Sequence, residues 1–499
     1  MTQLSSRPIQ VNIPRRRTRP GLTTLVVGAG EAGRALTRDL ARVSSFGLDP
    51  IGFLDDDPLK LRTLVARRPV LGTLGDLERV LEETHTEVLV IAIPSLPASV
   101  IQSIGARAMA CGVSVRHLPP FLSALQRQVA GTDMQSLQVR PLIGRAEMHV
   151  VSREAAHDIT GRRVLVTGAG GSIGSELCRQ IQGFGPASLV MLDHDESNLH
   201  RLTLEVSGRG LLDTDETVVA DIRDRPRIHQ LFREHRPEIV FHAAALKHLP
   251  VLERHPCEGV KSNVLGTQNL VEAAVAHRAS KLILISTDKA ADPSSVLGAT
   301  KRLAEMVLAD RHSPTTSLAS VRFGNVLGSR GSLLHVIKQQ VASGRPVTVT
   351  HPDVTRFFMT VEEAVGLVLE AAHMCERPGT FVLDMGEPVR IVDIVERFAV
   401  MLNARDVDIQ FTGLRPGEKL HEELFGATED VDPTAHARIA RAKPPTTSSW
   451  FRARLEDLYE SAEHNRPDEV RAHLRALVPE YTPTVPAHAA LAAPYPDDY

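Results

Sequence analysis

Four side chains in one stretch of the sequence have the types and the spacing needed for acid–base chemistry. Thr287, Asp288 and Lys289 directly follow the apolar run 281–286, and Lys301 comes after a short segment that contains glycine. A carboxyl beside an amine can exchange protons with a substrate when burial and neighbouring charge shift their pKa values. A surface ion pair at the end of a strand is the alternative interpretation.

A glycine-rich loop earlier in the chain predicts a site for a dinucleotide. It follows the apolar run 163–167 and precedes a helical pattern. Glycines at such a place allow a tight turn, close approach of a pyrophosphate and close packing of the helix on the strand. The candidate cofactor-binding residues of this loop are Gly168, Gly170, Gly171, Ser172, Ile173 and Gly174.

Further candidate cofactor contacts stand at the ends of the next predicted strands. Asp193 ends the second strand and would accept hydrogen bonds from the adenosine ribose, which favours NAD, with NADP as the alternative. Asp221 and Ile222 end the third strand, where adenine usually packs. Ala243 and Ala244 end the fourth, where small residues let the backbone approach the dinucleotide.

Alternating strand and helix patterns place these motifs in an α/β protein with two tandem Rossmann-type doubly wound parallel sheets. The second sheet carries the catalytic candidates and continues, from about residue 329, into a smaller C-terminal α/β substrate-binding region. The predicted parts are a disordered basic arm (1–21), an N-terminal Rossmann-like nucleotide-binding domain (22–118), a connector (119–160), a catalytic domain (161–447) and a C-terminal helix with a Pro/Ala-rich tail (448–499).

The first predicted domain has its own, weaker nucleotide motif. Gly28, Gly30 and Gly33 form a G-x-G-x-x-G pattern after a short apolar strand, and the acidic cluster 55–57 follows the next strand. Both features suit a dinucleotide. Because no catalytic residues follow, the sequence leaves open whether this domain binds a ligand or only keeps the fold.

Composition narrows the class of protein. The net charge is −3, so nothing global points to nucleic acid. No segment approaches the ~18 consecutive apolar residues of a membrane span. The four cysteines are far apart, which suits neither a metal site nor a disulfide framework. We therefore expect a cytoplasmic protein that binds neither nucleic acid nor a metal.

Taken together, the motifs resemble the extended short-chain dehydrogenase/reductases, and in particular their polysaccharide-biosynthesis branch of UDP-N-acetylglucosamine 4,6-dehydratases. The resemblance runs from Thr23 to about Pro444 and is densest in residues 166–176, 241–253, 285–305, 321–332, 355–360, 381–392 and 412–424. The larger members of this branch begin with membrane helices that are missing here, so the resemblance implies a form without an integral membrane segment. It also implies a homo-oligomer.

The resemblance implies a reaction on a UDP-N-acetylhexosamine. The sugar is oxidised at C4, loses water across C5 and C6 and receives the hydride back at C6. Asp288 would be the acid for the C6 hydroxyl, and Lys289 the C5 base or its partner. Thr287 would hydrogen-bond the C4 oxygen, and Lys301 would bind the nicotinamide ribose. Since a base must be neutral, we expect burial and the cationic Lys301 to lower the pKa of Lys289.

Leu297, four residues before Lys301, departs from most relatives, which have a tyrosine there that deprotonates the C4 hydroxyl. A leucine has no titratable group, and the large membrane-bound relatives often carry an equally inert methionine. The C4 proton must then leave through Asp288, through Thr287 and Lys301, or through a water. We favour Asp288. Lost or altered activity is the alternative explanation of Leu297.

Five polar residues are predicted to bind the nucleotide sugar. Lys247 would meet the diphosphate or a sugar hydroxyl, unless it is simply exposed to solvent. By resemblance, Asn325 contacts the diphosphate, and Arg356 and Arg415 lie near the phosphates, where a planar fork of donors suits them. Glu418 would hold the uridine ribose.

Two other functions remain open at this point. One is a related epimerase or dehydratase with a different regiochemistry or C5 outcome, and the other is a non-catalytic nucleotide-sugar or dinucleotide sensor. The intact residues 287–289 favour an enzyme over a sensor. Leu297 argues against a simple 4-epimerase, which needs a residue that shuttles the C4 proton in both directions.

Overall fold

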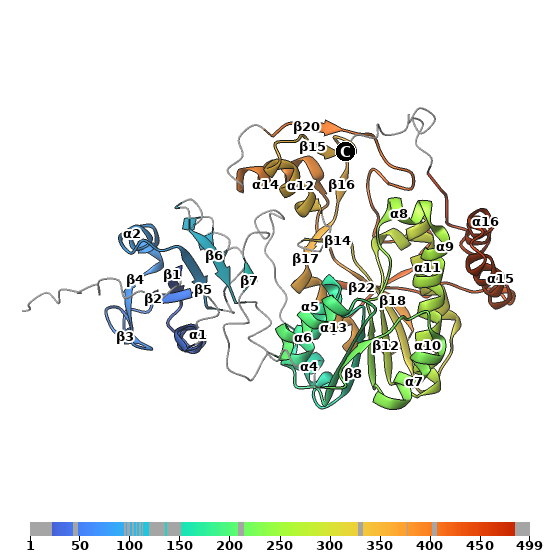
Figure 1. Cartoon of the computed structure of the whole chain (residues 1–499), viewed down its shortest axis with the longest axis horizontal. Helices are drawn as coiled ribbons and strands as arrows, with labels where there is room; N and C mark the ends of the chain where they lie inside the picture. The colour runs from blue at the N-terminus through green and yellow to red at the C-terminus, as the bar shows by residue number, and fades with distance from the viewer. Residues whose placement is uncertain are drawn as a thin grey trace, which may run out of the picture. The chain divides into compact units, whose positions relative to one another are not determined.

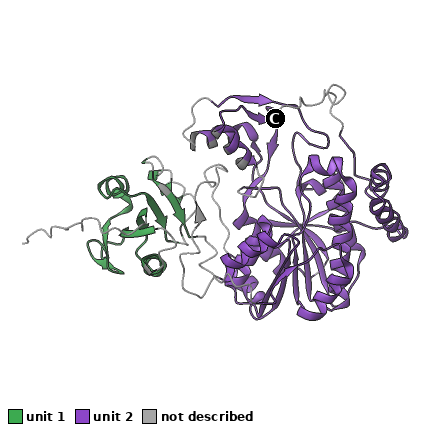
Figure 2. Ribbon diagram, in the orientation of Figure 1, with its two compact units in different colours: residues 1–96, 100–119, 128–137 green, residues 97–99, 120–127, 138–499 purple. Residues whose placement is uncertain are grey.

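The computed structural model describes residues 22–42, 48–93, parts of 96–118, 135–136, 151–207, 214–327, 333–376, 378–401 and 407–484. The chain divides into two compact units, shown in different colours in Figure 2: unit 1 contains residues 1–96, 100–119 and 128–137, and unit 2 the remainder. The predicted basic arm, most of the predicted connector and the tail after residue 484 lie outside the described residues. Among the described helices, none is long and apolar enough to cross a membrane.

Unit 1 is built on one sheet with the strand order β3-β4-β2-β1-β5-β6-β7. The strands are β1 (Leu22–Val27), β2 (Leu48–Leu54), β3 (Leu64–Val65), β4 (Arg68–Gly72), β5 (Val88–Ile91), β6 (Ser114–His117) and β7 (Gln135–Ser136). The five strands from β4 to β6 are parallel, and the two outer pairings are antiparallel. Helix α1 (Glu31–Arg42) follows β1, and α2 (Leu77–Glu83) follows β4 by way of the short helix η2 (Leu74–Asp76).

Unit 2 contains a larger sheet with the order β10-β9-β8-β11-β12-β13-β18-β22-β21. Its strands are β8 (Arg163–Thr167), β9 (Ser188–Asp193), β10 (Thr217–Val219), β11 (Ile239–His242), β12 (Lys281–Ile285), β13 (Ser317–Arg322), β18 (Gly379–Leu383), β21 (Val431–Pro433) and β22 (Ile439–Ala442). Pairing is parallel from β10 to β18 and antiparallel beyond. The predicted fold class is confirmed. The strand order reverses between β8 and β11, which is where ligands bind in such sheets.

Helices cover both faces of the larger sheet, as Figure 1 shows, and each face has its own apolar core. One core includes α4 (Arg153–Ile159), α5 (Ser172–Gly183), α6 (Glu196–Ser207) and α13 (Val361–His373). The other includes α7 (Arg225–His235), α10 (Gly266–Ala276) and α11 (Val296–Asp310). Covered faces explain why β8, β11 and β12 are almost uniformly apolar. Helix α4 falls within the predicted connector, so packing on this sheet begins earlier than the sequence pattern indicated.

A smaller α/β region follows β13. It contains the strand pairs β14 (Asn325–Leu327) with β17 (Phe358–Thr360), β15 (Val347–Val349) with β20 (Ile409–Phe411), and β16 (Thr355–Arg356) with β19 (Val389–Arg390). Helices α12 (Leu333–Ala342) and α14 (Ile391–Met401) complete a third apolar core with β15 and β17. Of the predicted substrate residues, Asn325 lies on β14 and Arg356 on β16.

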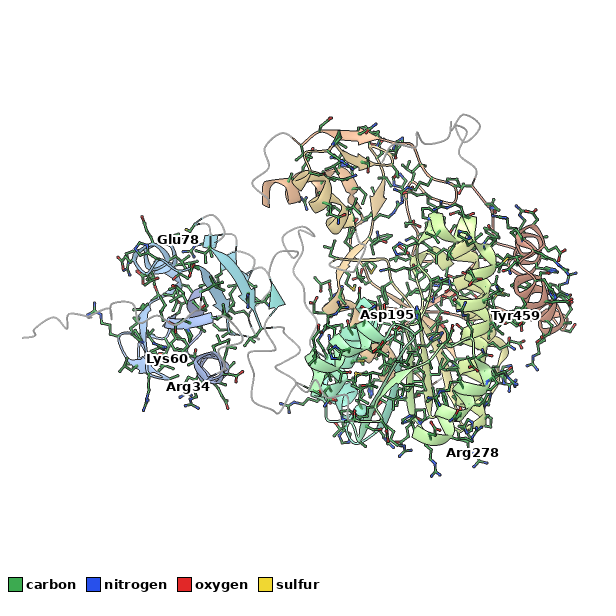
Figure 3. All side chains as sticks on the ribbon, viewed as in Figure 1. Arg34, Lys60, Glu78, Asp195, Arg278 and Tyr459 are labelled. Atoms are coloured by element: carbon green, nitrogen blue, oxygen red, sulfur yellow. The ribbon has the colours of Figure 1, made fainter. Side chains whose placement is uncertain are left out.

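Two helices near the C-terminus, α15 (Phe451–Glu463) and α16 (Pro467–Leu477), form a hairpin on unit 2. Its apolar face packs on α11 and on the run formed by α8 (Leu249–Arg254), α9 (Pro256–Gly259) and the π-helical turn η6 (Val260–Leu265). Tyr459, labelled in Figure 3, lies on α15 and donates its hydroxyl to Gln268 Oε1 at 2.6 Å.

Residues 478–484, which we call the C-terminal strap, leave this hairpin and cross two loops of unit 2. The backbone nitrogens of Thr482 and Thr484 donate to the carbonyl oxygens of Pro293 (3.0 Å) and Ser294 (3.3 Å). The carbonyl oxygen of Thr484 accepts from Gly417 N at 3.0 Å. The strap therefore ties the loop before α11 to the loop after β20.

Candidate functional site

The predicted dinucleotide loop lies between β8 and α5 and is packed at backbone distance. Gly168 has a φ of +65°, and a Cβ built there would lie 2.5 Å from the backbone nitrogen of Ala244. A Cβ on Gly174 would overlap the carbonyl oxygen of Gly168. Only glycines fit where β8, α5 and the chain after β11 approach so closely, and the small Ala243 and Ala244 keep that approach open.

The Asp193 carboxylate lies directly on this loop. Its Oδ2 accepts from Gly170 N at 2.9 Å, and its Oδ1 accepts from Asp195 N at 3.1 Å. Helix α5 begins at Ser172, after Gly171, without a side-chain cap at its N-terminus. Backbone amides beside a buried carboxylate fit a dinucleotide, because the pyrophosphate binds the amides and the ribose hydroxyls bind the carboxylate.

The remaining cofactor candidates differ in exposure. Asp221 is half exposed and paired with Arg223, with 2.6 Å between Arg223 Nη2 and Asp221 Oδ2. Ile222 is buried and fills the space over Gly266 of α10, where a built Cβ would lie 2.5 Å from Ile222 Cδ1. Ile173 is partly buried against the core on the α5 face. Of these candidates, Ile222 is therefore fixed by packing, and Asp221 by an ion pair.

The catalytic candidates begin where β12 ends. A single 3₁₀ turn, η7 (Asp288–Ala290), follows Thr287 and leaves Asp288 only 1% exposed. Asp288 Oδ1 accepts from Thr287 Oγ1 at 2.9 Å and from Lys289 Nζ at 3.0 Å. Asp288 Oδ2 is also buried and has no hydrogen-bond partner among the described residues. One oxygen of the carboxylate is therefore held by two donors, and the other is enclosed near Gly324 without a donor among the described residues.

Lys289 Nζ lies among three oxygen acceptors. They are Asp288 Oδ1 at 3.0 Å, Asn325 Oδ1 at 3.5 Å and Glu422 Oε1 at 3.5 Å. Three acceptors match the three donors of an ammonium group. Burial alone would lower the pKa of Lys289, but the carboxylates of Asp288 and Glu422 raise it above its ordinary value. The expectation that burial and Lys301 lower this pKa is therefore wrong.

Lys301 is buried on α11. Its Nζ donates to the carbonyl oxygen of Ile285, the last residue of β12, at 2.6 Å. Burial lowers the pKa of Lys301 to about 8, although Glu305 opposes the shift. His242 is also buried, between the hydroxyls of Thr167 (2.8 Å) and Thr267 (3.0 Å), and burial together with Lys301 lowers its pKa to about 3. A neutral imidazole therefore ends β11.

Leu297 lies one helical turn before Lys301 and is 5% exposed. It belongs to the apolar core formed by α8, α9, η6, α11 and the C-terminal hairpin. Its carbonyl oxygen accepts from Thr300 Oγ1 at 2.9 Å, as in an ordinary helix interior. The side chain can contribute packing at this position, and the proton chemistry has to come from its neighbours.

The predicted substrate residues fall into two groups. Asn325, Arg356 and Glu418 come together near Lys289: Asn325 contacts Lys289, and Arg356 Nη2 donates to Glu418 Oε1 at 2.8 Å. The side chains of Lys247 and Arg415 are exposed to solvent. Arg415 nevertheless joins the first group through its backbone, because its nitrogen donates to Glu418 Oε2 at 3.2 Å.

Sequence reasoning missed Glu422, whose side chain is 3% exposed. A main-chain bridge between Thr355 and His421 places it beside Arg356, and Arg356 Nε lies 3.6 Å from Glu422 Oε1. Arg356 and Glu422 each lie one residue after this parallel bridge, so their side chains point to the same face of the paired chains. A carboxylate next to a predicted substrate residue across such a bridge gives no local sequence signal.

A buried ionic network under the site was also missed. Arg322, the last residue of β13, is fully buried and binds Glu305 of α11 (2.5 Å) and Glu429 (2.7 Å). Arg302 binds Glu429 at 2.7 Å and Glu480 of the C-terminal strap at 3.2 Å. Glu305 lies four residues after Lys301, hence on the same face of α11, and this spacing is the one signal that could have found it.

Residues 164–444, more than half of the chain, match the family model described as polysaccharide biosynthesis protein. The chain belongs to this family. The matched range contains the glycine loop, the catalytic candidates and the residues around Arg356; unit 1 and the C-terminal hairpin lie outside it.

Similarity to two named proteins covers more of the chain than the family model does. The chain is 39% identical over 432 residues to a probable polysaccharide biosynthesis protein, EpsC, of Bacillus subtilis, covering 86% of this chain and 72% of that protein. It is 39% identical over 426 residues to the capsular polysaccharide biosynthesis protein CapD of Staphylococcus aureus, covering 84% and 71%. Among solved structures, Pen from Bacillus thuringiensis is 30% identical, with a TM-score of 0.53 over 57% of this chain and 90% of that one.

Proposed function

We propose that this protein is a nucleotide-sugar 4,6-dehydratase that converts UDP-N-acetylglucosamine to a UDP-4-keto-6-deoxy-N-acetylhexosamine. The observation that carries the proposal is the Asp288 carboxylate. One oxygen is bound by Thr287 and Lys289, and the other is buried without a partner among the described residues. Asp288 follows β12, which is separated only by β11 from the strand that precedes the glycine loop. Membership of a polysaccharide-biosynthesis family supports a sugar substrate.

NAD is the cofactor that we propose for the glycine loop. When bound, the nicotinamide supplies a reversible hydride acceptor, so that the sugar can be oxidised at C4 and reduced at C6 in one turnover. The Asp193 carboxylate would hold the adenosine ribose and disfavour a 2′-phosphate, which makes NADP the weaker alternative. Lys301 would bind the nicotinamide ribose, and Thr287 would orient the C4 oxygen.

Asp288 would carry two proton transfers in sequence. Its Oδ2 would take the proton of the C4 hydroxyl, because Leu297 cannot, and the resulting carboxylic acid would later protonate the departing C6 hydroxyl. Both steps use one oxygen of a buried group whose other oxygen is fixed by hydrogen bonds. Fixing the acid in this way contributes the positioning that general acid–base catalysis needs.

Lys289 would release its own proton to solvent, remove the C5 proton and give a proton back to C5 when the hydride returns to C6. In the resting site the Asp288 carboxylate is one of the two charges that favour the ammonium form. When Asp288 takes the C4 proton, that charge disappears and the pKa of Lys289 falls. The first proton transfer therefore prepares the base for the second.

The nucleotide part of the substrate would lie over the smaller α/β region. Arg356 and Arg415 would meet the phosphates, Asn325 the diphosphate, Lys247 the diphosphate or a sugar hydroxyl, and Glu418 the uridine ribose. Because Arg356 is bound to Glu418 in the structure, its fork of donors must exchange a carboxylate for a phosphate when substrate arrives. A cytoplasmic location and a homo-oligomeric state remain predictions.

The experiment that tests the proposal is incubation of the purified protein with UDP-N-acetylglucosamine in deuterated water, with the product examined by NMR. A 4-keto-6-deoxy sugar that carries deuterium at C5 is expected. UDP-N-acetylgalactosamine as the product would show an epimerase instead. If this and other UDP-sugars all stay unchanged, the protein is a sensor rather than an enzyme.

A further inference from the structure

The Glu422 carboxylate is the acidic group near Lys289 that the proposed reaction does not use. It comes from the chain after β20, whereas Asp288 comes from η7 and Asn325 from β14. Glu422 Oε1 lies 3.5 Å from Lys289 Nζ and 3.6 Å from Arg356 Nε, so one oxygen is shared by two cations. Such an arrangement inside a protein stabilises both charges and fixes both side chains.

The backbone holds this carboxylate in place. Thr355 and His421 form a parallel bridge, Thr355 N donates to the carbonyl oxygen of Leu420 at 3.1 Å, and the hydroxyl of Thr355 is 2.8 Å from His421 Nδ1. Arg356 Nη1 also donates to the carbonyl oxygen of Leu420 at 3.2 Å. Glu422 is therefore fixed relative to β16. It reaches Lys289 from a segment of the chain that is far in the sequence from Asp288.

We propose that Glu422 is the positioning residue of Lys289, which ties the proposed C5 base to the proposed phosphate-binding Arg356. The assignment of these two roles rests on the proposed function. When Arg356 turns to a phosphate, Glu422 keeps Lys289 as its partner. The Lys289 amine then keeps its position beside C5 of the sugar while Asp288 takes up the C4 proton.

Three charged groups face Lys289 and decide its charge state. Asp288 and Glu422 favour the ammonium form, and Arg356 opposes it. Replacing Glu422 by glutamine keeps the shape and removes one of the two favourable charges. The neutral amine should then form at a pH lower by about 1 to 3 units, which is the range for an opposite charge within ~4–6 Å.

The test compares Glu422→Gln with Glu422→Asp and with Glu423→Gln. Glu423 is the matched control, because it is the next carboxylate in the chain, is exposed and pairs with Lys419 at 2.9 Å. The probe is the rate of reductive methylation of Lys289 by formaldehyde and cyanoborohydride as a function of pH, measured on the Lys289 peptide by mass spectrometry. This readout requires a folded protein but no substrate turnover.

Glu422→Gln should move the methylation curve to lower pH, while Glu422→Asp and Glu423→Gln should leave it near that of the wild type. In turnover, Glu422→Gln should move the acidic limb of the kcat profile in the same direction, with a larger change in kcat than in KM. An unmoved methylation curve in folded Glu422→Gln would overturn the inference. If the wild type is inert towards UDP-sugars while the curve still moves, the proposed function fails and the link between Glu422 and Lys289 stands.

Discussion

The two Rossmann units have nearly the same glycine loop but surround it differently. Gly28 and Gly168 have φ values of +97° and +65°, and in each unit a Cβ on the last glycine of the motif would overlap the carbonyl oxygen of the first. Each loop also donates a backbone nitrogen to an aspartate at the end of the second strand: Ala29 N to Asp55 Oδ2 at 2.7 Å, and Gly170 N to Asp193 Oδ2 at 2.9 Å.

The difference lies in what faces the loop. In unit 1 the side chain of Ile93 stands against Gly28, and Lys60, labelled in Figure 3, binds the Asp55 carboxylate at 3.2 Å. In unit 2 the backbone at Ala244 faces Gly168, and the next strand ends in the catalytic candidates. The glycine loop is thus a feature common to both Rossmann sheets. The residues at the ends of the neighbouring strands distinguish the two units chemically.

The largest expected effect is on turnover, which should depend on residues of unit 2 and not on those of unit 1. Asp288→Asn and Lys289→Ala should each lower turnover by about 1,000-fold or more, since each removes a group that transfers a proton. NMR of the sugar product measures the turnover, and a dinucleotide titration should show that the cofactor still binds. Asp55→Asn in unit 1 is the control and should leave turnover within about twofold. Full activity of either unit 2 variant would contradict the assigned roles.

The next effect concerns the charges buried in unit 2. Arg322→Met should destabilise this unit by about 3–5 kcal/mol, because Glu305 and Glu429 lose their shared buried partner. Thermal and denaturant unfolding measure the change. Arg390→Met, which breaks an exposed pair with Asp393, is the control and should cost less than ~1 kcal/mol. Equal losses in the two variants would show that the network adds nothing to stability.

The glycine loops themselves should respond unequally to alanine. In Gly168→Ala the new Cβ meets backbone, which cannot rotate away, and the positive φ adds strain, so we expect a loss of about 1–3 kcal/mol. Binding of NAD, followed by fluorescence, should weaken at least about tenfold. Gly28 also has a positive φ, but in Gly28→Ala the new Cβ meets the flexible Ile93 side chain, and NAD binding to unit 2 should stay unchanged. Weaker binding in Gly28→Ala would place the cofactor in unit 1.

The smallest effect concerns Lys60 and Asp55. Burial raises the pKa of Asp55, but hydrogen bonds from Ala29 and Asp57 and the charge of Lys60 bring it below its ordinary value of 3.8. A lowered pKa stabilises the fold above the ordinary value, and this contribution is lost as the pH falls through the folded pKa. Lys60→Met should therefore cost less than ~1 kcal/mol at pH 7 and less still near pH 2. Unfolding curves at both pH values measure it, and a cost that persists in acid would exclude the ion pair as its cause.

The sequence was sufficient for the fold class and for the motifs that are local in the chain. Strand and helix periods gave both sheets, and the loop at Gly168 and the stretch from Thr287 to Lys289 carry their own signals. Contacts between residues that are far apart in the sequence could not be predicted from it. Glu422 reaches Lys289 only because β16 pairs with the chain at His421, and no period or spacing records that pairing.

The charge state of Lys289 was mispredicted for a related reason. Lys301 is close in the sequence, but its amine is fixed on the carbonyl oxygen of Ile285, and the two carboxylates that face Lys289 come from η7 and from the chain after β20. A pKa depends on distances through space. The Glu422 carboxylate, one of the two groups that raise the pKa of Lys289, could be placed beside it only once the fold was known.

The C-terminal strap is translated after the two loops of the site that it joins. The loop before α11, at Pro293 and Ser294, and the loop at Gly417 are joined through Thr482 and Thr484. A nascent chain that has grown only to α16 already contains every residue assigned to the reaction, yet both loops still lack these partners. Ribosomal synthesis runs from the N-terminus, so the site is fastened by some of the last described residues to be made.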